Sequence, residues 1–128
     1  MASLSNEWVK LLEALELHEN LLHAETQAIA ARDLDTIESI LAKKEQSLQI
    51  LVNARENIQE DPFSNKDAGE LISQVTELQR RNAEAFRKLA SNKTAKDNGV
   101  QSTKQKPMIR MLKNAYKNSS YGLKINRS

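Results

Sequence analysis

Apolar residues alternate at intervals of three and four through three long segments, and this spacing constrains the fold more than any other feature. It places the apolar side chains along one stripe of an α-helix, and that stripe must be buried lengthwise against other helices. The three segments cover residues 4–29, 34–58 and 71–89. Short connections near Asp33 and Pro62 make consecutive helices antiparallel neighbours. We therefore predict an all-α fold, an elongated antiparallel three-helix bundle that spans residues 1–92.

Residue types at the ends of the three segments indicate where each helix begins and ends. We expect Ser5 or Asn6 to cap the first helix and Asp33 the second, because their side-chain oxygens can accept from unpaired N–H groups of the first turn. We expect Pro62 to end the second helix, since proline disfavours helical geometry in the residue before it. The candidates for the start of the third helix are Ser64, Asn65 and Asp67.

Five polar residues fall on the apolar stripes: His18, Glu25, Lys44, Arg55 and Asn82. In two antiparallel hairpins, Glu25 lies within about a turn of Lys44, and Lys44 lies opposite Asn82. These three residues can therefore form one polar layer across the three helices. We favour a structural interpretation, in which the layer fixes the register or the long side chains reach outward to solvent. The alternative is a binding or catalytic triad.

Charge is distributed unevenly along the chain. Residues 1–92 contain 10 Lys or Arg and 16 Asp or Glu, whereas residues 93–128 contain 9 Lys or Arg and one Asp. Such asymmetry indicates an acidic body and a basic arm that acts separately. Residues 93–106 are polar and include Asn98-Gly99, so we expect a flexible linker there. The arm then covers residues 107–128.

The arm contains an apolar stripe of its own. Pro107 suits the first turn of a helix, and a short amphipathic stretch follows it. The apolar side chains on or beside one face of this helix are Met108, Ile109, Leu112, Ala115 and Tyr116. A helix of about eleven residues is unstable alone in water, so it should form only against another surface. Two surfaces stay open at this point: the bundle itself, with the arm docked as a fourth helix, and a partner.

Catalytic and metal sites are not expected in this sequence. The chain has no Cys, which excludes a disulfide framework, thiolate catalysis and the usual structural zinc sites. Its three glycines lie far apart, so no glycine-rich phosphate loop is present. Neither His18 nor His23 has a glutamate three residues before it, as di-iron bundles require. We therefore expect no enzyme, no cofactor and no small-molecule substrate.

Composition also bears on the cellular location. No apolar run approaches the roughly 18 residues that a membrane span needs. The N-terminal residues include acids where a signal peptide has basic and then apolar residues, so we expect a cytoplasmic protein. The charges of the arm are spread among apolar residues, which argues against nucleic acid as its partner. Its apolar face is short and lacks Trp and Phe, which argues against a membrane. The alternative function is a coiled-coil adaptor whose basic tail binds nucleic acid or an anionic membrane.

The stretch 21-LLHAETQAIAARDLDTIESILAKKEQSLQIL-51 resembles the FlgN family of flagellar type III export chaperones. The resemblance rests on a leucine pair, a glutamate one turn later, an Arg-Asp-Leu corner and a lysine-rich stretch before a second leucine ladder. In this chain the matching residues are Leu21, Leu22, Glu25, Ala28, Ile29, Arg32, Asp33, Leu34, Lys44 and Leu48. Later in the chain, Leu78, Asn82 and a basic amphipathic segment that ends in Tyr121-Gly122 extend the similarity.

The resemblance implies a function in flagellar assembly. Members of that family bind the C-terminal amphipathic segments of hook–filament junction proteins, keep them unassembled and deliver them to the export gate. A related chaperone for the filament cap would differ only in its client, and a homodimer stays open. On this basis the arm is expected to contact the client helix. The expected partner-binding residues are Met108, Ile109, Leu112, Ala115, Tyr116 and Tyr121.

Overall fold

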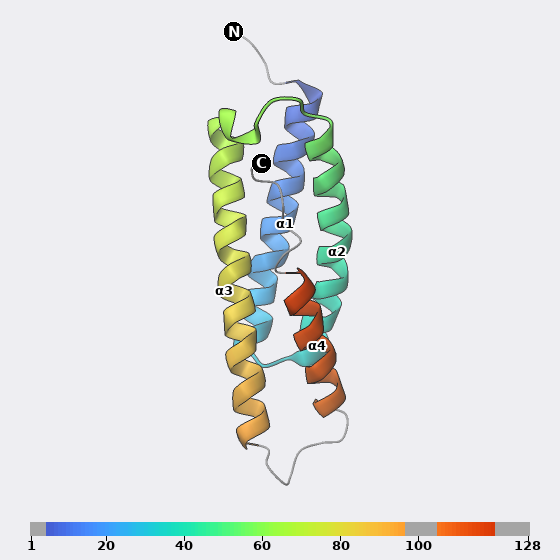
Figure 1. Ribbon diagram of the computed structural model, residues 1–128, viewed down its shortest axis with the longest axis vertical. Helices are drawn as coiled ribbons and strands as arrows, with labels where there is room; N and C mark the ends of the chain where they lie inside the picture. The colour runs from blue at the N-terminus through green and yellow to red at the C-terminus, as the bar shows by residue number, and fades with distance from the viewer. Residues whose placement is uncertain (1–4, 97–104, 120–128) are drawn as a thin grey trace.

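The structure, a computed structural model, describes residues 5–96 and 105–119 and is helical throughout most of that part (Figure 1). The elements are α1 (Asn6–Ala30), α2 (Leu34–Glu56), the 3₁₀ helix η1 (Pro62–Ser64), α3 (Lys66–Lys96) and α4 (Gln105–Ser119). No strand occurs among the described residues. The predicted all-α bundle is confirmed.

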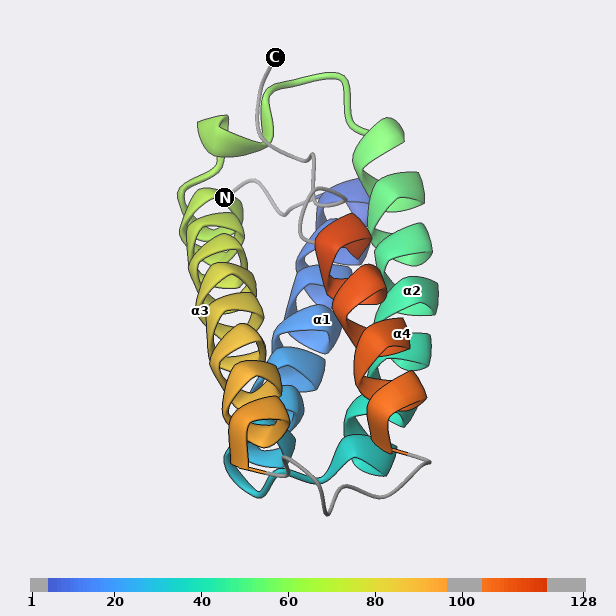
Figure 2. The same ribbon diagram turned by 60° about the horizontal axis from the view of Figure 1, so that its bottom comes forward.

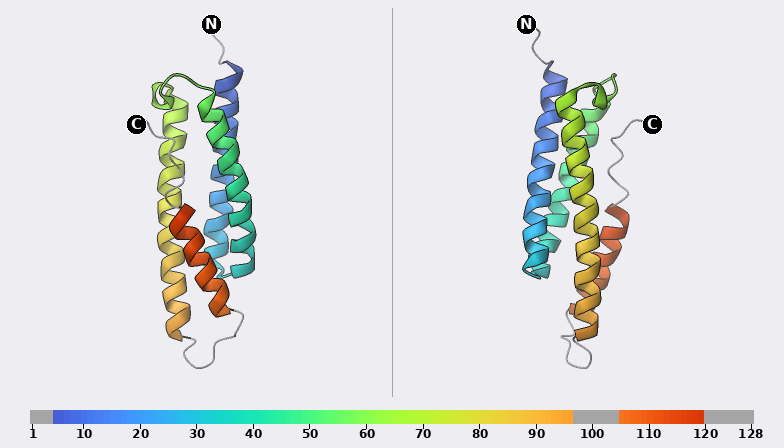
Figure 3. Two further views of the ribbon diagram at one scale, coloured as in Figure 1. Left: turned by 45° about the vertical axis from the view of Figure 1, so that its right-hand side comes forward. Right: turned by 90° about the vertical axis from the view of Figure 1, so that its left-hand side faces the viewer.

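The helices form a narrow bundle with α1 and α4 on opposite sides of the α2–α3 pair (Figures 1 and 3). The helix α1 packs along both α2 and α3. The shorter α4 contacts α3 and α2 and covers only the half of the bundle where α3 ends (Figure 2). The helices α1 and α3 run in the same direction, and α2 and α4 run antiparallel to them. The three-helix body thus carries a fourth helix along part of its length, which is the docked alternative that the sequence left open.

Two backbone hydrogen bonds close the corner between α1 and α2. Ala31 caps the end of α1, and Arg32 after it has φ 57°, in the left-handed region. The Arg32 N–H donates to the Ile29 carbonyl and the Asp33 N–H to the Ala28 carbonyl, both at 3.0 Å. This pair of bonds is the Schellman motif, which satisfies carbonyls that the helix leaves without partners.

Side chains cap the starts of the helices, largely as predicted. The Ser5 hydroxyl accepts from the Trp8 N–H at 3.4 Å, and an Asp33 carboxylate oxygen accepts from the Thr36 N–H at 3.2 Å. The Asn65 Oδ1 accepts from the Ala68 N–H at 3.1 Å, so α3 begins after Asn65. Hydrogen bonds from Thr36 also hold the pKa of the exposed Asp33 carboxyl below its usual value.

Pro62 does not end α2, contrary to the sequence prediction. The helix ends at Glu56, and Pro62 instead opens η1. The chain leaves the helical path because the Ile58 N–H bonds the Arg55 carbonyl while the Arg55 guanidinium donates to the Ile58 carbonyl at 2.9 Å. The Ile58 side chain is buried in the core by this turn. The Arg55 side chain therefore stabilises the turn that ends α2 and is not part of a polar layer.

The region between α3 and α4 also differs from the expected boundaries. The helix α3 continues to Lys96 and α4 begins at Gln105, so both helices extend into the segment 93–106 that was predicted to be a linker. Residues 97–104, to which most of the linker prediction applies, lie outside the described residues.

The core consists of two apolar clusters, one toward each end of the bundle. The first combines α1, α2 and α3 with Ile58; its buried residues are Leu11, Ala14, Leu15, Leu22, Leu51, Ala54, Ile58, Ala68, Ile72 and Val75. The second includes α4; its buried residues are Ala28, Ile29, Leu34, Ile37, Ile40, Phe86, Leu89, Ala90, Ile109, Leu112 and Tyr116. Polar side chains are buried between the clusters: His18, Glu25, Lys44, Ser47, Gln79 and Asn82.

Candidate functional site

The predicted polar layer of Glu25, Lys44 and Asn82 is present in the middle of the bundle. The Lys44 ammonium donates to both carboxylate oxygens of Glu25, with Nζ 3.0 Å from Oε1 and 3.1 Å from Oε2. The Asn82 amide donates to Glu25 Oε1 at 2.9 Å. All three residues are 5% exposed or less. The constant register of two antiparallel hairpins, read from the sequence, was enough to find this layer.

Asn82 is held in place by the backbone and side chains of α1. Its Nδ2 donates to the Leu22 carbonyl at 2.9 Å in addition to Glu25. The Thr26 hydroxyl lies 2.8 Å from Asn82 Oδ1 and donates to it. Because both ends of the amide are engaged, Asn82 locks α3 to one register on α1, as buried polar groups do in helical bundles.

A fourth residue, Tyr116 of α4, completes the layer. The Tyr116 hydroxyl donates to Glu25 Oε2, on the opposite side of the carboxylate from Asn82. The Tyr116 ring stacks on the Phe86 ring with 4.5 Å between centroids and 13° between planes. The Lys44 ammonium lies 5.5 Å from the centroid of the same ring, within range of a cation–π interaction. We call Glu25, Lys44, Asn82 and Tyr116 the polar cluster.

Burial governs the electrostatics of the polar cluster. It lowers the pKa of the Lys44 ammonium, an effect that the neighbouring Glu25 carboxylate opposes. Burial, together with the negative charge of Glu25, raises the pKa of the Tyr116 phenol. The phenol therefore stays protonated and can donate a hydrogen bond to Glu25. Each oxygen of Glu25 receives two donors, which is the condition under which a buried ion pair is tolerated.

A second set of buried polar residues lies beside the polar cluster, toward the first apolar core. His18 Nδ1 lies 2.9 Å from the Ser47 hydroxyl. Burial, with a smaller contribution from the charge of Lys44, lowers the pKa of His18 to about 4, so the imidazole is neutral at pH 7. Gln79 is also buried, and its Nε2 has no hydrogen-bond partner among the described residues. Neither Ser47 nor Gln79 was foreseen, because each lies one position away from the apolar stripe that the spacing predicts.

The predicted partner-binding face of α4 lies against the bundle. Ile109, Leu112 and Tyr116 are buried there, and Met108 and Ala115 are partly buried. Tyr121, the sixth predicted residue, lies outside the described residues. This face packs on a surface made by α2 and α3 residues of the second apolar cluster, among them Ile37, Ile40, Phe86, Leu89 and Ala90, together with Glu25 and Lys44, which contact Tyr116. We call this surface the α4 seat.

Among residues 108–116 of α4, whose side chains the structure describes, the exposed ones are polar apart from Met111, which is 46% exposed. Arg110 and Lys113 are exposed beside it. The sequence pattern by itself assigned the hydroxyl of Tyr116 no partner. The predicted layer of Glu25, Lys44 and Asn82 is the signal that could have revealed that partner. Lys44 and Asn82 both donate to Oε1 of Glu25, which leaves Oε2 with room for a donor from a fourth helix.

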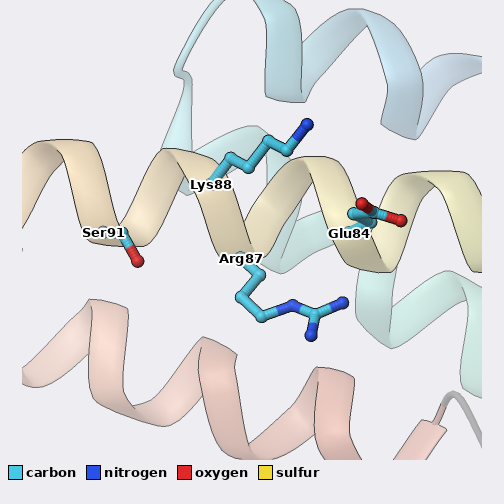
Figure 4. Close-up of a pocket in the computed structure, with 4 residues that line it drawn as sticks. All are labelled: Glu84, Arg87, Lys88 and Ser91. Atoms are coloured by element: carbon cyan, nitrogen blue, oxygen red, sulfur yellow. The ribbon is translucent and has the colours of Figure 1, made fainter.

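Two hollows on the surface lie outside the polar cluster and the α4 seat. One is lined by Glu84, Arg87, Lys88 and Ser91 of α3 (Figure 4). Figure 4 shows Arg87 pointing toward α4, whereas Lys88 points to the other side of α3. A second lies between α1 and α3, where His23 Nε2 and Glu19 Oε2 are 3.9 Å apart. Across the described ranges, no three acidic or histidine side chains are grouped to hold a metal ion.

Comparisons with known proteins leave the chain without an assigned relative. No family model, curated protein or solved structure matches it. The resemblance to the FlgN family therefore rests on the sequence motifs quoted above. Within residues 5–96 and 105–119, every helix is too short or too polar to cross a membrane.

Proposed function

We propose that this chain is a helix-binding export chaperone of the FlgN type, which holds the C-terminal amphipathic helix of a flagellar hook–filament junction protein until delivery to the export gate. The observation that supports this proposal is α4 itself. An amphipathic helix of 15 residues lies on the seat with its apolar face inward, so the seat has the shape and chemistry to hold a helix of that kind.

The contacts of the seat account for binding of such a helix. Burying an isoleucine or leucine side chain contributes about 1.5–3 kcal/mol, and Ile109 and Leu112 are both almost fully buried. A helix of this length is unstable alone, so these contacts must also offset the cost of ordering it.

We propose that the client helix binds the α4 seat. In the absence of the client, α4 of the same chain occupies the seat and therefore competes with it. The apolar face of α4 was expected to contact the client, but in the structure the bundle covers that face. A client helix can replace α4 on the seat, which leaves the bundle core of α1, α2 and α3 intact. As part of the same chain, α4 competes at an effective concentration on the order of 1 mM.

The experiment is a titration of the full chain with C-terminal segments of hook–filament junction proteins, measured by calorimetry. The Leu112→Asp variant removes an anchor of α4, and the matched Lys113→Asp variant changes an exposed neighbour. If clients bind the seat, Leu112→Asp tightens binding about tenfold or more and Lys113→Asp changes it little. If clients bind the apolar face of α4, Leu112→Asp abolishes binding instead.

A titration in salt separates the proposal from binding of an anionic partner. Apolar contacts on the seat should change little between 50 and 200 mM salt, whereas binding to phosphates falls by orders of magnitude when several are contacted. Absence of binding by every junction-protein segment to both the wild-type chain and Leu112→Asp would refute the proposed function.

A further inference from the structure

Glu25 supplies the carboxylate among the described residues of the α4 seat, and the donors to this carboxylate come from both sides of the interface. Lys44 and Asn82 belong to the bundle and keep their places with respect to α1. Tyr116 is the donor that α4 supplies. When α4 leaves, Glu25 Oε2 retains the Lys44 ammonium at 3.1 Å but loses the phenol. Any helix that then occupies the seat buries this carboxylate oxygen again and must supply a donor to it.

We infer that the α4 seat selects its partner by a tyrosine: a helix binds in place of α4 when it carries two aliphatic residues and a tyrosine at the spacing of Ile109, Leu112 and Tyr116. This inference rests on the proposed function, because it specifies which amphipathic helices the chaperone accepts. The required pattern is an aliphatic residue, a second aliphatic residue three positions later, and a tyrosine four positions after that.

Three contacts restrict the last position to tyrosine. Stacking on Phe86 and the approach of the Lys44 ammonium both require an aromatic ring. The Glu25 carboxylate requires a donor at the tip of that ring. Phenylalanine satisfies the ring contacts but leaves Oε2 short of a donor, and an unmade hydrogen bond to a buried charge is costly. An acidic residue would place a second negative charge against Glu25 and would be rejected.

The aliphatic positions supply affinity, whereas the tyrosine supplies specificity. Apolar burial is not directional, so Ile109 and Leu112 can be replaced by other aliphatic side chains of similar size. A hydrogen bond to a buried carboxylate depends on donor position within a few tenths of an ångström. A helix shifted by one turn on the seat would lose the bond even if its apolar face still fitted. The tyrosine thus also sets the register of the bound helix.

The test uses the full chain with Ile109→Asp and Leu112→Asp, which removes both aliphatic anchors of α4 and frees the seat. A labelled peptide with the sequence of residues 105–119 is titrated into this variant and followed by fluorescence anisotropy. The same peptide is made with Tyr116→Phe, and with Lys113→Ala as a control at an exposed position. We expect the unchanged and Lys113→Ala peptides to bind with similar Kd, and the Tyr116→Phe peptide to bind at least tenfold more weakly.

Glu25→Gln in the same freed chain identifies the acceptor. If the hydroxyl acts through the carboxylate, the tenfold difference between tyrosine and phenylalanine peptides shrinks to threefold or less in this variant. Circular dichroism and thermal unfolding show whether Glu25→Gln still folds. If Glu25→Gln does not fold, the comparison of the tyrosine and phenylalanine peptides on the freed chain still tests whether the seat selects tyrosine.

The outcomes separate this inference from the proposed function. Equal binding of the tyrosine and phenylalanine peptides overturns the selection by tyrosine, even if junction-protein segments bind. No binding of the unchanged peptide to the freed seat overturns it as well. Conversely, a strong preference for tyrosine without binding of any junction-protein segment supports the selection and refutes the flagellar client.

Discussion

At the scale of single residues, the main feature is a buried ion pair whose carboxylate is fully hydrogen-bonded. Glu25 is 0% exposed and Lys44 is 5% exposed, yet each carboxylate oxygen has two donors. Removing one partner of such a pair leaves the other charge buried without compensation, which typically costs 3–5 kcal/mol. The stability of the fold should therefore be far more sensitive to these positions than to exposed charges nearby.

Lys44→Ala should lower the free energy of unfolding by about 3–5 kcal/mol, because the Glu25 carboxylate then loses the ammonium that faces both of its oxygens. The matched control is Lys43→Ala, the preceding and exposed lysine, which should change stability by about 0.5 kcal/mol or less. Urea denaturation followed by circular dichroism measures both. Similar losses in the two variants would show that the ion pair contributes nothing.

His18 makes stability depend on pH. Its pKa of about 4 in the folded chain lies below the value of 6.5 expected when it is unfolded, so the unfolded state binds the proton more readily. The stability contribution is complete above pH 6.5 and is lost progressively as the pH falls toward 4. The difference amounts to about 3 kcal/mol.

Denaturation midpoints measured between pH 7.5 and pH 4 test this effect. The drop across that range should be smaller in His18→Gln than in the wild-type chain, since glutamine does not titrate but can still bond the Ser47 hydroxyl. His23→Gln, at an exposed position that also carries an imidazole, should keep the full drop. An identical pH profile for wild type and His18→Gln would contradict the prediction.

At the scale of elements, the corner between α1 and α2 performs two tasks within three residues. Arg32 takes the left-handed conformation that ends α1, and Asp33 donates its N–H to α1 while its side chain caps α2. A residue with a Cβ is disfavoured by about 1–2 kcal/mol in the left-handed region, which glycine occupies freely. The sequence therefore carries some strain at this turn.

Arg32→Gly should raise stability by about 0.5–1 kcal/mol, because the relief of the left-handed conformation exceeds the added freedom of the unfolded chain. Arg32→Ala is the control, since it removes the guanidinium but keeps the Cβ, and it should not stabilise. Thermal unfolding of the three proteins measures the effect. An equal gain from both variants would attribute it to the side chain, not to the backbone.

At the scale of the whole molecule, the buried polar residues lie between two apolar clusters. The first cluster needs only α1, α2, α3 and the turn that follows α2, whereas the second includes α4. Because α4 contacts α2 and α3 along part of their length only, it can leave without exposing the first cluster. The fold therefore permits α4 to open as a unit of its own.

Hydrogen exchange should show this hierarchy directly. Amides in α4 should exchange faster than those in the middle of α1, because opening of α4 requires less free energy than global unfolding. Tyr116→Phe should raise exchange in α4 about tenfold and leave the first cluster unchanged, since only the bond to Glu25 is lost. Equal protection of α4 and α1 would mean that α4 opens only with the whole bundle, and that result would count against replacement of α4 by a client.

Local and repetitive features were accessible from the amino-acid sequence alone. The three long helices follow from periodic spacing, the cap at Asp33 from its residue type, and the layer of Glu25, Lys44 and Asn82 from the register that short turns impose. The same reasoning misplaced the end of α2, because the bonds between Arg55 and Ile58 depend on a side chain turning back on its own backbone.

The position of α4 was decided only by the tertiary structure. Its apolar stripe is equally suited to the bundle and to a partner, so the sequence alone leaves the choice open. What places it on the bundle is the Phe86 ring, which stacks on the Tyr116 ring, and the Glu25 carboxylate, which meets the Tyr116 hydroxyl across 91 positions of sequence. Periodicity reveals that a face must be buried, but the surface that buries it depends on which distant groups the fold brings within hydrogen-bonding distance.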